Sequence, residues 1–150
     1  MIKFGTGGFR AIIGEDFTRS NLEMLSFALI KIIKRSGMEK KPVIIGYDRR
    51  FLSDLAAKWI ACVFAAEGIE IHFINYDAPT PLIMFDVLKE NASYGMAVTA
   101  SHNPAEYNGV KIFTAGGRDA TEEITDEIEL QIAKIDLSEI HSMEYSKALA

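Results

Sequence analysis

Residues 94–111 read YGMAVTASHNPAEYNGVK, and this stretch decides how the chain folds. The run from Tyr94 to Thr99 is apolar and is typical of a buried strand. Ser101 follows at the carboxyl end of that strand, where ligands gather in open α/β sheets. Pro104 fixes its own φ and disfavours a helical Asn103, so the turn is stiff. A stiff turn suits a side chain that must be aimed, and we expect Ser101 to lie at a functional site.

The next strand, expected over Val110–Thr114, follows after only the residues from Ser101 to Gly109. A parallel crossover needs about a dozen residues or more. We therefore expect this strand to run antiparallel to the strand before it, in a mixed sheet. Asn108-Gly109 is a hairpin signal and predicts a tight turn. That turn would bring Lys111 back towards Ser101, although an exposed strand lysine is the alternative.

The rest of the chain alternates strands with helices, which indicates an α/β fold. Ser20 and Glu23 have the spacing of a capping box at the start of a helix that Gly37 ends. Thr80 and Pro81 are typical of an N-cap and a first helical position. The remaining expected strands are 2–4, 9–13, 43–47 and 70–75, and the helices begin near residues 20, 52, 80 and 121. Residues 136–150 carry less pattern and are expected to form a linker or a short helix.

Composition narrows the possible functions. The 150 residues are 49% hydrophobic and 25% charged, which is ordinary for a globular domain. The net charge of −5 argues against nucleic acid as a partner. Cys62 is the only cysteine, so no internal disulfide can form and a reducing compartment is expected. With no apolar run of membrane-spanning length and no signal-peptide core, we expect a cytoplasmic protein without a membrane partner.

Two further segments carry groups that could bind an anion. The glycine-rich stretch 5–10 ends in Arg10, whose planar fork suits phosphate, although a flexible turn is the alternative. Asp48 and Arg50 follow a predicted strand and could hold a phosphorylated loop, or form an ordinary surface ion pair. Asp48 could orient Arg50 or cap the next helix.

Ser101 and His102 together raise the possibility of a hydrolase. The flanking glycines of a nucleophile elbow are absent, and we expect the two adjacent side chains to point apart. His72 and His141 are expected to be structural, and Cys62 to be buried and inert. No His, Cys or Asp cluster has the spacing of a zinc site.

Four segments, taken in order, resemble the first domain of the α-D-phosphohexomutases, the phosphoglucomutase/phosphomannomutase superfamily. They are FGTGGFR at 4–10, GYDRR at 46–50, Thr80-Pro81, and TASHNP at 99–104 followed by NGVK at 108–111. The resemblance covers residues 2–135, and the serine loop is its most specific motif. Gly7 stands where the family often has Asp or Ser. The resemblance implies a three-layer α/β/α sandwich with a mixed, mostly parallel sheet.

The resemblance also implies a reaction. Ser101 would be a phosphoserine that gives its phosphoryl group to a hexose phosphate, through a hexose 1,6-bisphosphate, and Mg²⁺ would bind through the serine phosphate. Arg10 and Lys111 would lie beside the phosphoserine. His102 and Asn103 would belong to its loop, and Arg50 with Asp48 would help to hold that loop.

The family's metal loop, DGDGDR, lies in a second domain and does not occur here. We therefore expect residues 1–138 to be domain I, residues 139–150 to lead towards an absent domain II, and the chain alone to be inactive. Domains II–IV and a phosphorylated hexose are the implied partners. Gly-Gly-Phe-Arg at the first motif favours glucose or mannose phosphate over glucosamine phosphate. The alternative is a non-catalytic α/β interaction domain that keeps the serine loop as scaffold.

Overall fold

A mixed sheet forms the centre of the computed structural model, which describes residues 2–5 and 7–148. In these residues the strands are β1 (Gly8–Ile12), β2 (Val43–Tyr47), β3 (Ile71–Asp77), β4 (Tyr94–Val98), β5 (Tyr107–Thr114) and β6 (Arg118–Asp119). The order across the sheet is β1-β5-β4-β2-β3, and β6 also pairs with β5.

Strand direction follows from the short connection after β4. β5 is antiparallel to β4, β1 and β6, whereas β2 is parallel to both β3 and β4. Because β1, β4 and β6 are all antiparallel to β5, they run in the same direction as one another. Every described strand except β5 therefore runs the same way. The predicted antiparallel step and the mixed, mostly parallel sheet are both confirmed.

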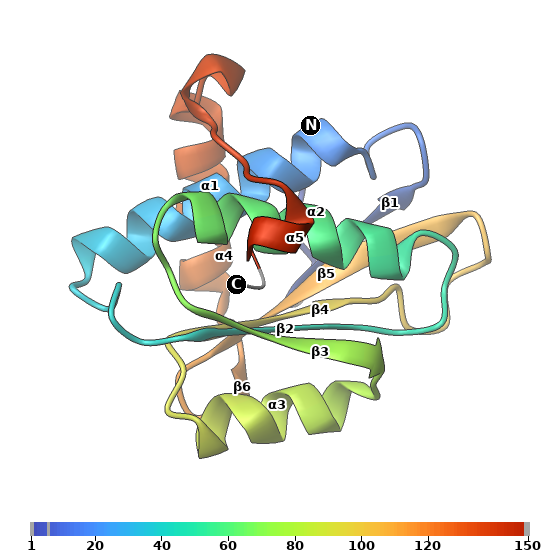
Figure 1. Ribbon diagram of the computed structural model, residues 1–150. Helices are drawn as coiled ribbons and strands as arrows, with labels where there is room; N and C mark the ends of the chain where they lie inside the picture. Colours follow the sequence, from blue (N-terminus) through green and yellow to red (C-terminus); the bar gives the residue numbers. More distant parts are fainter. Residues whose placement is uncertain (1, 6, 149–150) are drawn as a thin grey trace.

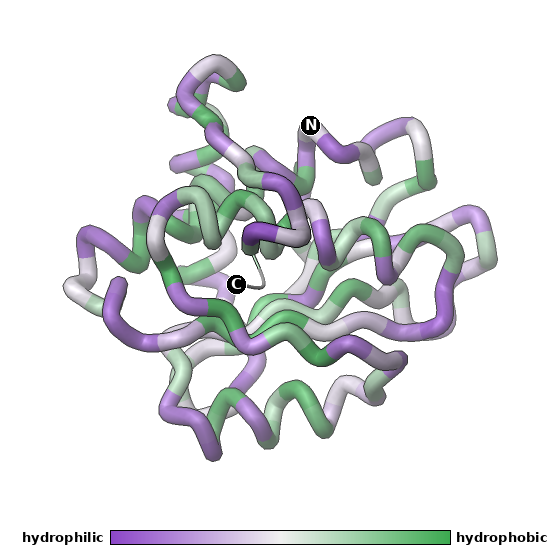
Figure 2. The backbone as a smooth tube through the Cα atoms, in the orientation of Figure 1, coloured by the Kyte–Doolittle hydropathy of each residue, from purple (hydrophilic) through white to green (hydrophobic). Residues whose placement is uncertain are grey.

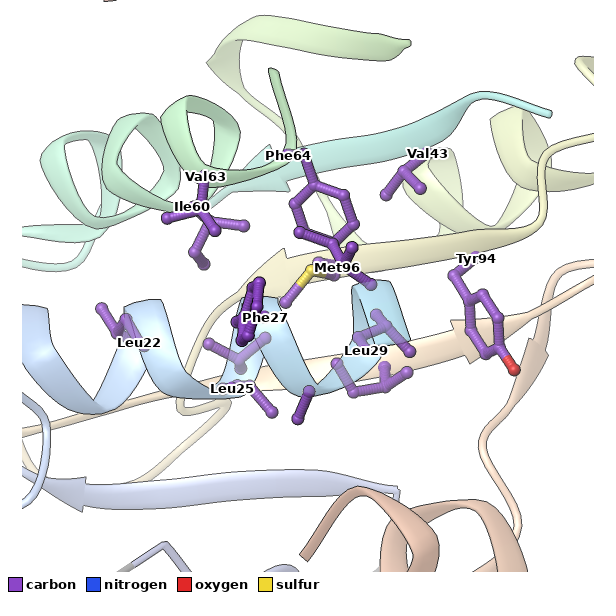
Figure 3. Packing of buried hydrophobic residues seen from close by; sticks show 14 of the residues in the cluster. Leu22, Leu25, Phe27, Leu29, Val43, Ile60, Val63, Phe64, Tyr94 and Met96 are labelled. Carbon is purple, nitrogen blue, oxygen red and sulfur yellow. The ribbon is translucent and has the colours of Figure 1, made fainter. Parts of the chain in front are cut away.

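Helices cover both faces of the sheet, and the predicted three-layer sandwich is confirmed (Figure 1). One face carries α1 (Arg19–Arg35), α2 (Ser53–Ala66), α4 (Glu122–Lys134) and the short α5 (Tyr145–Ala148). The other face carries α3 (Thr80–Lys89). The larger core lies under α1 and α2 and includes Leu25, Phe64 and the buried Met96 of β4 (Figure 3).

The layer under α3 is thin because two strand glycines face the helix. A Cβ on Gly95 would lie 2.4 Å from Val87 Cγ2, and one on Gly46 would lie 2.6 Å from Ile83 Cδ1. The two missing side chains let α3 approach the sheet closely around a small core that includes Ile44. Figure 2 shows this distribution along the chain, with hydrophobic residues in the central strands and hydrophilic ones in the connecting loops.

The helix starts differ from the sequence prediction. The N-cap of α1 is Thr18, whose Oγ1 accepts a hydrogen bond from Asn21 N at 3.3 Å. The capping box predicted at Ser20 is therefore wrong, and Glu23 binds Arg19 instead. Helix α3 has Pro79 as its N-cap, so Thr80 already lies inside it. Gly37, with a φ of +72°, follows α1 as predicted.

The predicted turn at Asn108-Gly109 is also wrong. Both residues lie inside β5, and the chain reverses earlier, between β4 and Tyr107. Asn108 is fully buried, whereas the asparagine of a hairpin turn is normally exposed. At the N-terminus, the strand expected at 2–4 is reduced to a single bridge between Phe4 and Phe9.

The C-terminal segment folds back onto α2. It contains a 3-10 helix, Leu137–Glu139, and then α5. Met143 N donates to Cys62 O, and the ring of Tyr145 packs edge-on against Phe73. Residues 149–150 of the predicted linker lie outside the described residues. Among the helices that the structure describes, none combines the length and apolar character needed to cross a bilayer.

Candidate functional site

Ser101 lies on the loop that joins β4 to β5, at the carboxyl edge of the sheet. Its φ is +56°, a left-handed conformation that side chains other than glycine rarely adopt. Its N–H donates to Thr99 Oγ1 at 3.0 Å, and its own side chain is exposed. A non-glycine residue in this region costs on the order of 1 kcal/mol or more, so neighbouring groups must hold it there.

Arg50 is the group that holds the loop. Its Nη2 donates to Ser101 O at 2.8 Å and to Asn103 O, and its Nη1 donates to Pro104 O at 2.9 Å and Tyr107 O at 3.1 Å. The Arg50 side chain is 16% exposed. One guanidinium therefore satisfies four carbonyls of the serine loop, which a lysine could not do in the same geometry.

Asp48 in turn fixes Arg50. Its Oδ1 accepts from Arg50 N at 2.9 Å and from Ser53 Oγ at 2.8 Å. Ser53 is the first residue of α2. Asp48 thus orients Arg50 and also binds the start of the next helix, the two roles that the sequence left open.

His102 lies close to the serine hydroxyl. Its Nδ1 is 3.2 Å from Ser101 Oγ, so the expectation that these side chains point apart is wrong. The left-handed backbone at Ser101 turns the two side chains to the same side. Even so, no carboxylate pairs with the His102 imidazole anywhere in residues 2–5 and 7–148. The acid of a Ser-His-Asp triad is therefore missing there.

Arg10 and Lys111 project from one face of neighbouring strands, each across a glycine. Arg10 pairs with Gly109, and Lys111 pairs with Gly8. Gly109 O accepts from Thr99 N at 2.9 Å, so Arg10 lies in the same row as the start of the serine loop, two strands away. This places Arg10 at the predicted edge of the sheet.

Lys111 lies inside β5, beside β4. It pairs with Ala97, four residues before Ser101 in the sequence. Its Nζ is 3.7 Å from Asp119 Oδ1. The Asn-Gly pair that was predicted to form the turn belongs to the strand, so the chain reverses before Tyr107 instead.

A cleft of about 590 Å³ opens beside the serine. It is lined by Asp48, Arg49, Arg50, Asp77, Ala78, Pro79 and Ser101. Arg49 donates to Asp77 across the cleft and holds the pKa of that carboxyl below its ordinary value. Asp77 was missed by the sequence analysis, although its place at the end of β3 was a usable signal.

The cleft offers Mg²⁺ few free ligands of its own. No group of three or more His, Cys, Asp or Glu residues within the described ranges could hold a metal ion. Asp48 Oδ1 already accepts two hydrogen bonds, and Asp77 is paired with Arg49. A phosphoryl group on Ser101 would add the kind of oxygen ligands that Mg²⁺ prefers.

Fold and site together define an α/β protein with an exposed serine on a clamped loop, beside a cleft at the carboxyl edge of its sheet. The chain belongs to the phosphoglucomutase/phosphomannomutase family, whose α/β/α domain I matches residues 1–139. Thr6 of the first family motif lies outside the described residues.

Individual relatives support this assignment. A probable phosphoribomutase of Schizosaccharomyces pombe is 37% identical over 77% of this chain and 21% of its own length. A phosphoglucosamine mutase of Prochlorococcus marinus strain AS9601 is 40% identical over 79% of this chain and 25% of its own length. The crystal structure of a provisionally named phosphomannomutase from Thermus thermophilus matches with a TM-score of 0.83 and 36% identity, covering 87% of this chain and 30% of that one. The chain thus spans less than a third of the length of these relatives.

Proposed function

We propose that this chain supplies the phosphoserine loop of a sugar-phosphate mutase. Ser101 would carry the phosphoryl group that moves between the 1- and 6-positions of a hexose phosphate, through a hexose 1,6-bisphosphate. The observation that carries this proposal is the exposed Ser101 hydroxyl on a loop that Arg50 holds by four carbonyls. Such rigidity suits a group that must meet its acceptor in line, because phosphoryl transfer depends mainly on positioning and charge stabilisation.

The step from enzyme to sugar would break the bond between phosphorus and Ser101 Oγ and form a bond from phosphorus to the attacking sugar oxygen. The proton of the sugar hydroxyl leaves to a base, and the Ser101 oxygen departs as an alkoxide that takes up a proton. His102 Nδ1, 3.2 Å from Oγ, is the nearest group for that proton. Arg10 and Lys111 supply positive charge on the same sheet, and Mg²⁺ bound through the phosphoryl oxygens would neutralise the remainder.

The substrate class that we propose is a phosphorylated sugar. Relatives named for ribose phosphate and for glucosamine phosphate match this chain at similar identity. These two names do not favour glucose or mannose phosphate, the preference expected from the first motif, whereas the relative from Thermus thermophilus is provisionally named as a phosphomannomutase. The remaining parts of such an enzyme, corresponding to domains II–IV, would hold the rest of the sugar and the metal.

Intact-mass analysis tests the function. It uses the natural-length protein, that is, the protein at the length that its gene encodes, purified from the source organism. After incubation with glucose 1,6-bisphosphate and Mg²⁺, we expect a mass increase of one phosphoryl group that is lost in Ser101→Ala. Absence of that increase, with unchanged folding, would contradict the proposal and favour a non-catalytic interaction domain. Labelling of Ser101 by an acylating serine reagent would instead indicate a hydrolase.

A further inference from the structure

A buried polar pair lies behind the serine loop. Asn108 and Ser53 are both completely buried, yet neither faces the cleft. Asn108 Nδ2 donates to Ser53 Oγ at 2.9 Å and to Phe51 O at 3.0 Å, and its Oδ1 accepts from Gly109 N at 2.8 Å. Every polar atom of the Asn108 side chain is thus engaged, as a buried amide requires.

The pair is continuous with the groups that hold Ser101. Ser53 Oγ receives the hydrogen bond from Asn108 and donates its own to Asp48 Oδ1 at 2.8 Å. The same Asp48 oxygen accepts from Arg50 N, and the Arg50 guanidinium donates to the serine loop. Because that loop leads directly into Tyr107 and Asn108, the hydrogen bonds and the backbone form a closed ring.

Two strained residues lie in this ring. Ser101 has a φ of +56° and Leu52 a φ of +68°, and neither is glycine. Leu52 is the N-cap of α2 and has no side-chain cap hydrogen bond. Its conformation is held by the flanking contacts, Phe51 O to Asn108 and Ser53 Oγ to Asp48. Strained backbone persists only where its surroundings over-determine it, and here one ring constrains both positions.

We propose that Asn108 and Ser53 are positioning residues for Ser101, acting through Asp48 and Arg50. The effect on phosphoryl transfer rests on the proposed function, but the effect on the loop does not. Removing the Ser53 hydroxyl leaves the buried Asn108 Nδ2 with one acceptor fewer and Asp48 Oδ1, at the cleft, with one donor fewer. Arg50 then loses its fixed support, and the loop samples conformations in which Ser101 relaxes from the left-handed region.

Hydrogen–deuterium exchange on the 150-residue chain tests the loop. In Ser53→Ala we expect the amides of Ser101, Asn103 and Tyr107 to exchange about fivefold faster. This factor corresponds to the net free energy that one hydrogen bond contributes. The matched control is Ser26→Ala in α1, which also removes a fully buried hydroxyl, bonded only to Leu22 O. Loop exchange in Ser26→Ala should stay at the wild-type rate. Equal acceleration in both variants, or none in Ser53→Ala, would overturn the proposal.

Kinetics of the natural-length protein test the consequence. Ser53→Ala should lower the kcat for a sugar phosphate about fivefold or more and leave KM near its wild-type value, because substrate contacts are intact. A similar fall in kcat for Ser26→Ala would contradict a positioning role. If the loop loosens as expected but the wild-type protein neither forms phosphoserine nor turns over a sugar phosphate, the proposed function fails while the structural coupling stands.

Discussion

Gly109 is the residue where the sheet leaves least room for a side chain. A Cβ there would lie 2.0 Å from Phe9 O, a backbone atom of β1 that cannot rotate away. Gly109→Ala should therefore push β1 from β5 and lower the free energy of unfolding by about 2 kcal/mol or more. Urea denaturation followed by circular dichroism measures this. Gly5→Ala, whose Cβ would meet only an ordinary contact at 3.8 Å, should change stability by less than about 0.5 kcal/mol.

The two adjacent arginines of the cleft should respond differently to the same substitution. Arg50→Lys keeps the charge but cannot reach four carbonyls, so we expect a loss of about 2 kcal/mol in the free energy of unfolding. Arg49→Lys affects an ion pair whose arginine is 88% exposed, and it should cost under about 0.5 kcal/mol. Equal losses in parallel urea titrations would show that Arg50 does not hold the loop.

At the residue scale, the site residues that directly follow a strand could be predicted from the sequence. Ser101, Asp48 and Arg50 all follow buried strands, so the prediction that they meet at one edge needed only the strand assignments. It could not give the register of Lys111 against β4, because that depended on whether Asn108 was exposed in a turn or buried in a strand. The contact of Asn108 with Ser53 decides this, and it joins residues 55 positions apart in the chain.

At the element scale, two hydroxyl residues, Thr18 and Ser20, are candidates for the N-cap of α1. The structure gives the role to Thr18, so Thr18→Ala should lower the free energy of unfolding by about 1 kcal/mol. Ser20 lies inside the helix and is exposed, and Ser20→Ala should be neutral or slightly stabilising because alanine has the higher helix propensity. Thermal melts of the two variants compare the effects directly. A larger loss in Ser20→Ala would restore the capping box that the sequence predicted.

The cap was misassigned because Thr18 and Ser20 are both residue types that cap helices, and only Ser20 has a glutamate three residues later. Ser20 with Glu23 fits a capping box, but Glu23 is drawn to Arg19, four residues before it. The Asn21 side chain donates to Asp16 O, which fixes the turn that leads into α1, so that the helix begins before Ser20. Neither contact has a fixed sequence signature. Strand direction, by contrast, was predictable, since the number of residues between β4 and β5 is too small for a parallel crossover.

At the scale of the whole molecule, the layers could be predicted from the alternation of strands and helices, whereas the cleft could not. Its walls come from β2, β3 and the serine loop, and β3 lies at the far edge of the sheet from β1. The strand order β1-β5-β4-β2-β3 is needed to see that Asp77, at the end of β3, can share a cleft with Ser101. Arg10 lies on the opposite side of Ser101, two strands away from β4. Arg10 and the cleft thus lie on opposite sides of the serine loop along this edge.

The groups at this edge of the sheet predict how the chain behaves on its own. Lys111 is paired with Asp119, Asp48 and Asp77 already accept hydrogen bonds, and within the described residues no group of three or more His, Cys, Asp or Glu could hold a metal ion. We expect the 150-residue chain to unfold cooperatively, to show no shift in melting temperature with millimolar Mg²⁺, and to leave glucose 1-phosphate unconverted in a coupled assay. The protein at the length that its gene encodes, assayed in parallel, shows whether the proposed activity is present under the same conditions. Turnover by residues 1–150 alone would mean that this edge of the sheet is a complete catalytic site.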